Sequence, residues 1–174
     1  MRILVVGMGL IGGSICKSIK AATSHAVYGC DVQQAVLDDA IADGAIDGTG
    51  TMTDGTYDMI ILCLHQRIAI QMVQEALPKI PAGTILVDTC GLKGRMVRDL
   101  TYRCRKADVR YVGTHPMAGR EKNGYYASIP NLFQNANLIV TPVDGTDEAA
   151  LDTVKELADQ MGFGKIDRKS TRLN

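Results

Sequence analysis

Three glycines near the start of the chain have a spacing that suits phosphate binding. Gly7, Gly9 and Gly12 form the pattern G-x-G-x-x-G directly after residues 2–6, which are apolar after Arg2. In such a pattern the first glycine allows a tight turn, the second lets a pyrophosphate approach the backbone, and the third lets a helix pack on a strand. The phosphates would face the free N–H groups at the helix start, where the helix dipole favours negative charge. The alternative is a tight turn without a ligand.

An acidic residue follows at the distance that a dinucleotide-binding unit requires. Asp31 ends the segment 26–30, close to the expected offset of roughly 20 residues. Its carboxylate would accept hydrogen bonds from the adenosine ribose hydroxyls and would repel a 2′-phosphate. We therefore expect NAD as the cofactor, with NADP still possible. Because Asp also suits the position before a helix, Asp31 could instead only cap the next helix.

A histidine stands where proton transfer could take place. His115 lies three positions after the short strand-like segment 109–112, where we expect a strand to meet a loop, and Pro116 would stiffen the bend after it. An imidazole exchanges protons near neutral pH, so it can remove a hydroxyl proton while a hydride leaves for a nicotinamide. The alternative is a structural histidine bonded to the backbone.

Apolar runs and helical spacing predict the elements that position these residues. The expected strands are residues 2–6, 26–30, 59–64, 84–88, 109–112 and 138–141, and one more begins within 161–166. Helices are expected from about residue 11 and over 33–43, 68–77, 96–105 and 148–161, and Pro78 ends the third of them. Residues 45–56 hold at most a short strand, and residues 115–136 read as a functional loop with short helical turns.

Buried strands that alternate with helices predict an α/β fold with a doubly wound parallel sheet of the Rossmann type and right-handed crossovers. Ligands of such sheets bind at the carboxyl ends of the strands. This rule selects three further segments, residues 63–66, 88–93 and 113–121.

Composition narrows the classes of protein. The chain has 174 residues, 46% hydrophobic and 22% charged, with 19 basic and 19 acidic side chains, so we expect no nucleic-acid or membrane partner. It starts with a strand and has no apolar run of about 18 residues, so we expect neither a signal peptide nor a membrane span. Five scattered cysteines and three histidines predict reduced thiols, a cytoplasmic location and no metal site.

The segment H-P-M-A-G at residues 115–119 is a specific motif. Further motif residues are 9–14, 44–47, 88–93, 132–133 and 141–142, with Glu121 and Gly124. Together they resemble the prephenate dehydrogenase family, which includes the arogenate dehydrogenases. The resemblance covers residues 1–166, as the N-terminal nucleotide-binding domain. It implies a second, C-terminal helical domain, absent here, that would supply dimer contacts and part of the substrate pocket.

The resemblance also implies an activity. The family oxidises prephenate with NAD(P), releases CO2 and yields 4-hydroxyphenylpyruvate for tyrosine biosynthesis. His115 matches the catalytic histidine that bonds the ring hydroxyl, and Glu121 matches a glutamate near the substrate pocket, where the alternative is a solvated carboxylate. The residues expected to contact the cofactor are Gly7, Gly9, Leu10, Ile11, Gly12, Asp31, Cys63 and Leu64.

The chain departs from the family pattern at some of these positions. Gly91 replaces a serine that reaches substrate and histidine, so Thr89, Cys90, water or a backbone N–H must serve instead. Arg120 could bind a substrate carboxylate or be solvated. His65 could contact the nicotinamide ribose or be an exposed residue at a helix start, and Lys93 could orient the strand-end loop or be a surface lysine.

Residues 167–174 turn abruptly polar and basic, and we expect this tail to be non-native, translated from a sequencing adaptor. Three functions remain open: a prephenate dehydrogenase, an arogenate dehydrogenase, and a dinucleotide-sensing module without chemistry. Other β-hydroxyacid-type dehydrogenases are more distant alternatives, because they do not explain H-P-M-A-G.

Overall fold

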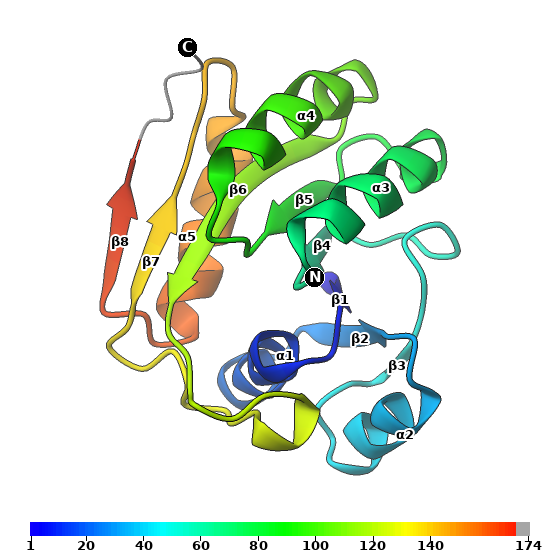
Figure 1. Ribbon diagram of the computed structural model, residues 1–174, viewed down its shortest axis with the longest axis vertical. Helices are drawn as coiled ribbons and strands as arrows, with labels where there is room; N and C mark the ends of the chain where they lie inside the picture. The colour runs from blue at the N-terminus through cyan, green and yellow to red at the C-terminus, as the bar shows by residue number, and fades with distance from the viewer. Residues whose placement is uncertain (170–174) are drawn as a thin grey trace.

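The computed structural model describes residues 1–169, which form one eight-stranded sheet with helices on both faces (Figure 1). The strands are β1 (Arg2–Val6), β2 (Ala26–Cys30), β3 (Gly48–Thr49), β4 (Met59–Leu62), β5 (Ile85–Asp88), β6 (Arg110–Met117), β7 (Asn137–Val140) and β8 (Lys165–Arg168). Their order in the sheet is β3-β2-β1-β4-β5-β6-β7-β8. The order reverses at β1, so the carboxyl ends of β1 and β4 border a crevice of the kind that binds ligands in open α/β sheets.

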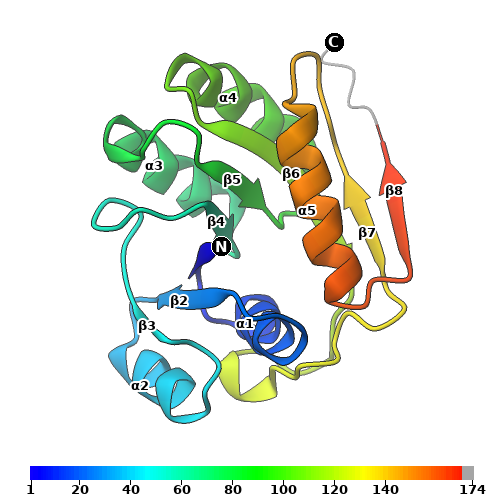
Figure 2. The same ribbon diagram turned by 180° about the vertical axis from the view of Figure 1, so that it is seen from behind.

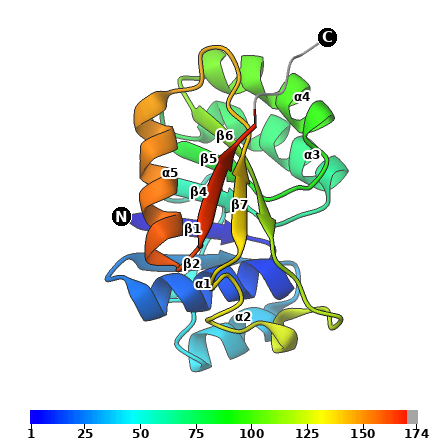
Figure 3. The ribbon, with the colours of Figure 1, turned by 90° about the vertical axis from the view of Figure 1, so that its left-hand side faces the viewer.

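Five helices cover the sheet in two layers. They are α1 (Leu10–Ala22), α2 (Gln34–Ala42), α3 (Gln66–Ala76), α4 (Lys93–Lys106) and α5 (Glu148–Gln160), with 3-10 turns η1 (Leu77–Lys79) and η2 (Tyr125–Ala127). Ile3 and Val5 pack toward α1, α2 and α5, while Leu4 and Val6 pack toward α3 and α4. The two layers are visible from behind and from the side (Figures 2 and 3). The apolar strands are therefore buried on both faces, as the sequence predicted.

One part of the sheet differs from the prediction of parallel strands throughout. All neighbouring strands are parallel except β6 and β7, which run antiparallel and pair Thr114 with Val140 and His115 with Ile139. The expected strand 109–112 thus continues through Met117, because β7 supplies a partner for its second half. The predicted strand–loop junction at His115 is wrong, and Pro116 also lies inside β6.

Several element boundaries move by a few residues. Helix α4 begins at Lys93 instead of residue 96, and α3 begins at Gln66 instead of residue 68. Residues 66–67 and 93–95, which begin these helices, are polar or glycine and give no apolar spacing to detect. Helix α3 ends at Ala76, and Pro78 lies in η1.

Two residues of the predicted tail belong to the sheet. Asp167 and Arg168 continue β8 beside β7, and Arg168 pairs with Glu148 at the start of α5 at 2.8 Å. Residues 170–174 lie outside the described residues. The non-native origin of the tail stays a prediction.

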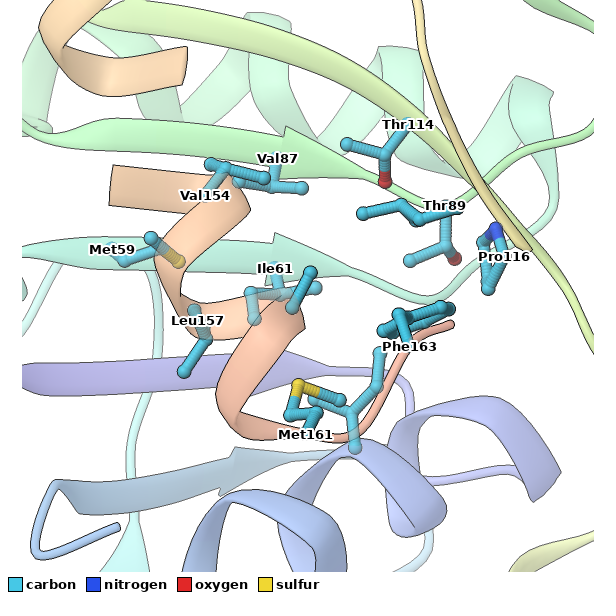
Figure 4. A pocket seen from close by; sticks show the side chains of 13 residues that line it. Met59, Ile61, Val87, Thr89, Thr114, Pro116, Val154, Leu157, Met161 and Phe163 are labelled. Carbon is cyan, nitrogen blue, oxygen red and sulfur yellow. The ribbon is translucent and has the colours of Figure 1, made fainter. Parts of the chain in front are cut away.

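The apolar core on the α5 side holds a small cavity of about 50 Å³ (Figure 4). Its lining includes Met59, Ile61, Val87, Leu157 and Met161. Such a lining offers a water molecule few hydrogen-bond partners. Its lining also includes Thr89, Thr114 and Pro116, beyond the end of β5 and within β6. No glycine of the G-x-G-x-x-G turn lines the cavity, so it is not the predicted cofactor crevice.

Within residues 1–169, no helix has the length and apolar character to cross a membrane. The same part of the chain holds no group of three His, Cys, Asp or Glu side chains that could bind a metal ion.

Buried thiols make a testable contribution to stability. Cys104 is fully buried in α4, and burial raises the pKa of its thiol from 9.0 to about 12. Because the native pKa lies above the unfolded value, the contribution is complete below pH 9 and is lost as the pH rises through the native pKa. We expect Cys104→Ala to reduce the fall in unfolding free energy between about pH 8 and pH 10 by about 1 kcal/mol. Urea titrations at both pH values measure this; equal falls in both proteins would contradict it.

Candidate functional site

The glycine turn after β1 is built as its sequence predicted. Gly7 has φ +92°, a conformation that L side chains rarely adopt, and a Cβ there would lie 2.5 Å from the Cys63 carbonyl oxygen. A Cβ on Gly12 would overlap the Gly7 carbonyl oxygen and lie 3.3 Å from the Cys63 Cβ. Close packing by itself therefore already requires glycine at both positions.

Gly9 differs from its two partners because packing does not require it. It is the residue before α1, and a Cβ built on it meets no atom within 4 Å. The first N–H groups of a helix have no partner within the helix, so the start of α1 beside this open space could receive a pyrophosphate. Leu10 and Ile11, predicted as cofactor contacts, form the first turn of α1 and are only partly buried.

Asp31 fixes the neighbouring turn with both of its carboxylate oxygens. Oδ2 accepts a hydrogen bond from the Met8 N–H at 2.7 Å, and Oδ1 accepts one from the Gln33 N–H at 2.9 Å. Asp31 thus holds the glycine turn to the end of β2 and also shapes the entry to α2. Each oxygen keeps a further lone pair for a ribose hydroxyl.

Cys63 and Leu64, the predicted cofactor contacts after β4, lie against the glycine turn. The Leu64 side chain approaches the Cβ position of Gly7, and burial raises the pKa of the Cys63 thiol to about 12, so this cysteine is a neutral packing group. His65 is exposed immediately before α3.

A buried ionic network holds the strand-end segment 88–93. The Asp88 side chain is fully buried and pairs with Lys93, and it also accepts bonds from the Tyr111 hydroxyl at 2.6 Å and the Cys90 N–H at 2.9 Å. Burial lowers the pKa of Lys93, and burial beside Asp88 raises that of Tyr111 well above its usual value. Lys93 therefore helps to orient this loop, which is the first of the two roles predicted for it, and it is not a surface lysine. Tyr111 was missed, since a tyrosine inside a strand carries no distinguishing pattern.

His115 meets this loop from β6. Its Nδ1 lies 3.4 Å from the Thr89 carbonyl oxygen, and a Cβ on Gly91 would lie 3.2 Å from its Cε1. The imidazole is half-buried. The structure thus brings His115 and Gly91 together, at the carboxyl end of β5.

The segment after β6 crosses α1 and is anchored to it. The Ile129 N–H donates to the Ser14 hydroxyl at 3.1 Å, and a Cβ on Gly13 would lie 2.8 Å from Tyr125. The Tyr125 hydroxyl donates to Asp43 of the turn after α2 at 2.9 Å. The predicted functional loop is therefore an ordered segment, and sequence periodicity gave no sign of this anchor.

Arg120 and Glu121 lie in the exposed part of that segment. Arg120 donates from Nη1 to the Ala127 carbonyl oxygen at 2.8 Å, and Glu121 is solvent-exposed. Within residues 1–169, no hydrogen bond or ion pair joins either residue to His115. Their substrate-binding roles stay predictions.

Comparison with known proteins places the chain. A family model described as the prephenate dehydrogenase nucleotide-binding domain matches residues 15–166. The chain belongs to the prephenate dehydrogenase family. The resemblance that the sequence motifs predicted is thereby confirmed.

Relatives with curated names and solved structures agree with this membership. A prephenate dehydrogenase of Lactococcus lactis is 31% identical over 80% of this chain and 40% of its own length. A cyclohexadienyl dehydrogenase of Zymomonas mobilis is 30% identical over 97% of this chain and 58% of its own length. The crystal structure of the A. aeolicus prephenate dehydrogenase in complex with hydroxyphenyl propionate and NAD+ matches with a TM-score of 0.88 and 28% identity. The match covers 99% of this chain and 60% of that one. The chain thus spans between two and three fifths of these proteins, and its Rossmann-type fold is that of the family's nucleotide-binding domain.

Proposed function

We propose that this chain is the dinucleotide-binding part of an NAD-dependent prephenate dehydrogenase. The observation that carries the proposal is the placement of His115 against the strand-end loop, in the same sheet edge as the glycine turn. A dinucleotide-sensing module would need the turn and Asp31 but would leave His115 without a task.

The residues present fit a dinucleotide. The open space beside Gly9 admits a pyrophosphate to the start of α1, and Asp31 presents fixed oxygens to the adenosine ribose. Gly7, Gly12, Cys63 and Leu64 shape the turn. When bound, NAD accepts the hydride that leaves the substrate ring.

His115 handles the proton of the same reaction. As hydride leaves the ring carbon that bears the hydroxyl, His115 takes the hydroxyl proton, and a ketone forms. The ring carboxylate then leaves as CO2, the electrons of the broken bond make the ring aromatic, and His115 returns the proton to the phenol oxygen. The balance is prephenate and NAD to 4-hydroxyphenylpyruvate, CO2 and NADH, in tyrosine biosynthesis.

An arogenate dehydrogenase is the second candidate, because the Synechocystis arogenate dehydrogenase matches the fold equally well, with a TM-score of 0.87. The two substrates differ only in whether the side chain is a keto acid or an amino acid. We further propose substrate contacts from Gly91, Arg120 and Glu121, a homodimer through the remaining part of the longer protein, and a cytoplasmic location.

NADH formation in the presence of prephenate or arogenate tests the activity. We expect one of them to reduce NAD with the chain in excess over substrate, so that a slow single turnover is visible. Prephenate turnover with none from arogenate supports the first candidate, and the reverse supports the second. Because the resemblance implies that a C-terminal domain supplies part of the substrate pocket, this chain alone could be inactive, and the decisive assay uses a protein that also carries that domain. No turnover of either substrate there, with NAD bound, contradicts the enzyme proposal and favours a sensing module.

The cofactor assignment makes a separate prediction. We expect Asp31→Asn to weaken NAD binding by roughly tenfold or more, since a charge-assisted hydrogen bond to the ribose is lost. It should also narrow the preference for NAD over NADP, because the repulsion of the 2′-phosphate disappears. Asp38→Asn, an exposed acid within α2, is the matched control and should change neither affinity in calorimetric titrations. An unchanged NAD to NADP ratio in Asp31→Asn would contradict the role of Asp31.

A further inference from the structure

We propose that the Thr89 carbonyl holds His115 in the neutral form that is protonated on Nδ1, and that Gly91 is a positioning residue that lets the ring reach this carbonyl. The inference deepens the proposed function, and it rests on that function only where it assigns the proton transfer to His115. It gives His115 a partner in place of the serine hydroxyl that Gly91 lacks, namely a backbone oxygen of the same loop.

The first support is that Thr89 is fixed. Its N–H and its Oγ1 both donate to the Leu62 carbonyl oxygen, each at 3.1 Å, which ties the residue to the end of β4. The loop beyond it is tied at Cys90, whose Sγ lies 3.2 Å from the Leu64 carbonyl oxygen, and at Leu92, whose carbonyl accepts from Gln66 at 2.6 Å. The Thr89 carbonyl therefore cannot turn freely away from His115.

The second support is the fit between Gly91 and the imidazole. A Cβ on Gly91 would lie 3.2 Å from Cε1, 3.5 Å from Nε2 and 3.6 Å from Nδ1 of His115, so it would press on the ring itself. The His115 backbone is held in β6 opposite Ile139, so the side-chain ring is the part that can give way. A Cβ at position 91 therefore requires the ring or the loop to shift by a few tenths of an ångström.

These two constraints select one tautomer. A carbonyl oxygen only accepts hydrogen bonds, so the Nδ1 and Thr89 oxygen atoms, 3.4 Å apart, attract each other only when the proton is on Nδ1. Nε2 is then unprotonated and free to accept the substrate hydroxyl proton. When Nε2 becomes protonated, the Thr89 oxygen still faces an N–H and stabilises the positive ring. Such contacts are often long without substrate and shorten in the reacting complex.

The tautomer can be observed directly in 15N-labelled chain by long-range 1H–15N NMR, at about pH 8, where an ordinary histidine is neutral. The chain has three histidines, His25, His65 and His115, and His115→Asn assigns the signals of the third. We expect His115 to be protonated mainly on Nδ1. Gly91→Ala should shift the ratio of the two tautomers toward Nε2 protonation by up to roughly tenfold, the reach of one neutral hydrogen bond.

Gly94→Ala is the matched control, because it adds the same methyl group three residues later where nothing lies within 4 Å. It should leave the His115 tautomer unchanged. A wild-type ring protonated mainly on Nε2 would overturn the proposal, as would a Gly91→Ala ratio equal to that of Gly94→Ala. The wild-type spectrum decides even if Gly91→Ala folds poorly. The measurement needs neither substrate nor turnover, so failure of the dehydrogenase assay would not change its outcome.

Discussion

His115→Asn is expected to slow substrate-dependent NAD reduction by roughly 10²- to 10⁴-fold, the usual contribution of a general acid–base residue. Asparagine can still bond a hydroxyl, but it cannot accept the proton that the substrate hydroxyl must lose as the ketone forms. The ring is half-buried in β6 and makes one long contact to Thr89, so the substitution leaves the sheet intact. Single-turnover NADH formation measures the rate.

NAD affinity is the control for this variant. His115 lies outside the glycine turn, so calorimetry should give the same NAD affinity for His115→Asn and the wild type. Thermal melting should also be unchanged within a few degrees. If the variant kept the wild-type rate of NADH formation, His115 would not be the base.

The glycine turn supplies the second large effect, as a contrast between two substitutions of the same kind. Gly9→Ala should leave the unfolding free energy within about 0.5 kcal/mol of the wild type, because its methyl group meets no atom within 4 Å. It should weaken NAD binding by at least about tenfold, since the methyl group occupies the space where the pyrophosphate approaches the backbone.

Gly12→Ala should instead lower the stability of the fold. Its methyl group would overlap the Gly7 carbonyl oxygen, so we expect a loss of about 3 kcal/mol or more of unfolding free energy. Urea titration and NAD calorimetry on both variants test the contrast. Wild-type NAD affinity in Gly9→Ala would show that the turn does not carry the pyrophosphate.

The parts of the site that the sequence predicted depend on local requirements. A turn that needs positive φ at Gly7 and close packing at Gly12 leaves its mark in residue type and spacing. Asp31 is fixed by its distance along the chain, because a strand and a helix separate it from the turn. The alternation of buried strands and helices likewise predicted that helices cover both faces of the sheet.

The parts that could not be predicted depend on distant partners. His115 lies inside a strand because β7, which begins at Asn137, pairs with the second half of β6. The contact between Gly91 and the imidazole, and the bond from Tyr111 to Asp88, join residues more than 20 positions apart. A single sequence shows which residues could meet in this way but not that they do.

We expect this chain to bind NAD, with its glycine turn and Asp31 recognising the cofactor. Calorimetric titration of the 174-residue chain with NAD and with NADP tests this most directly. We expect NAD to bind at least about tenfold more tightly than NADP, because Asp31 repels the 2′-phosphate. Tighter binding of NADP, or no binding of NAD by chain that shows a cooperative thermal melt, would contradict the claim.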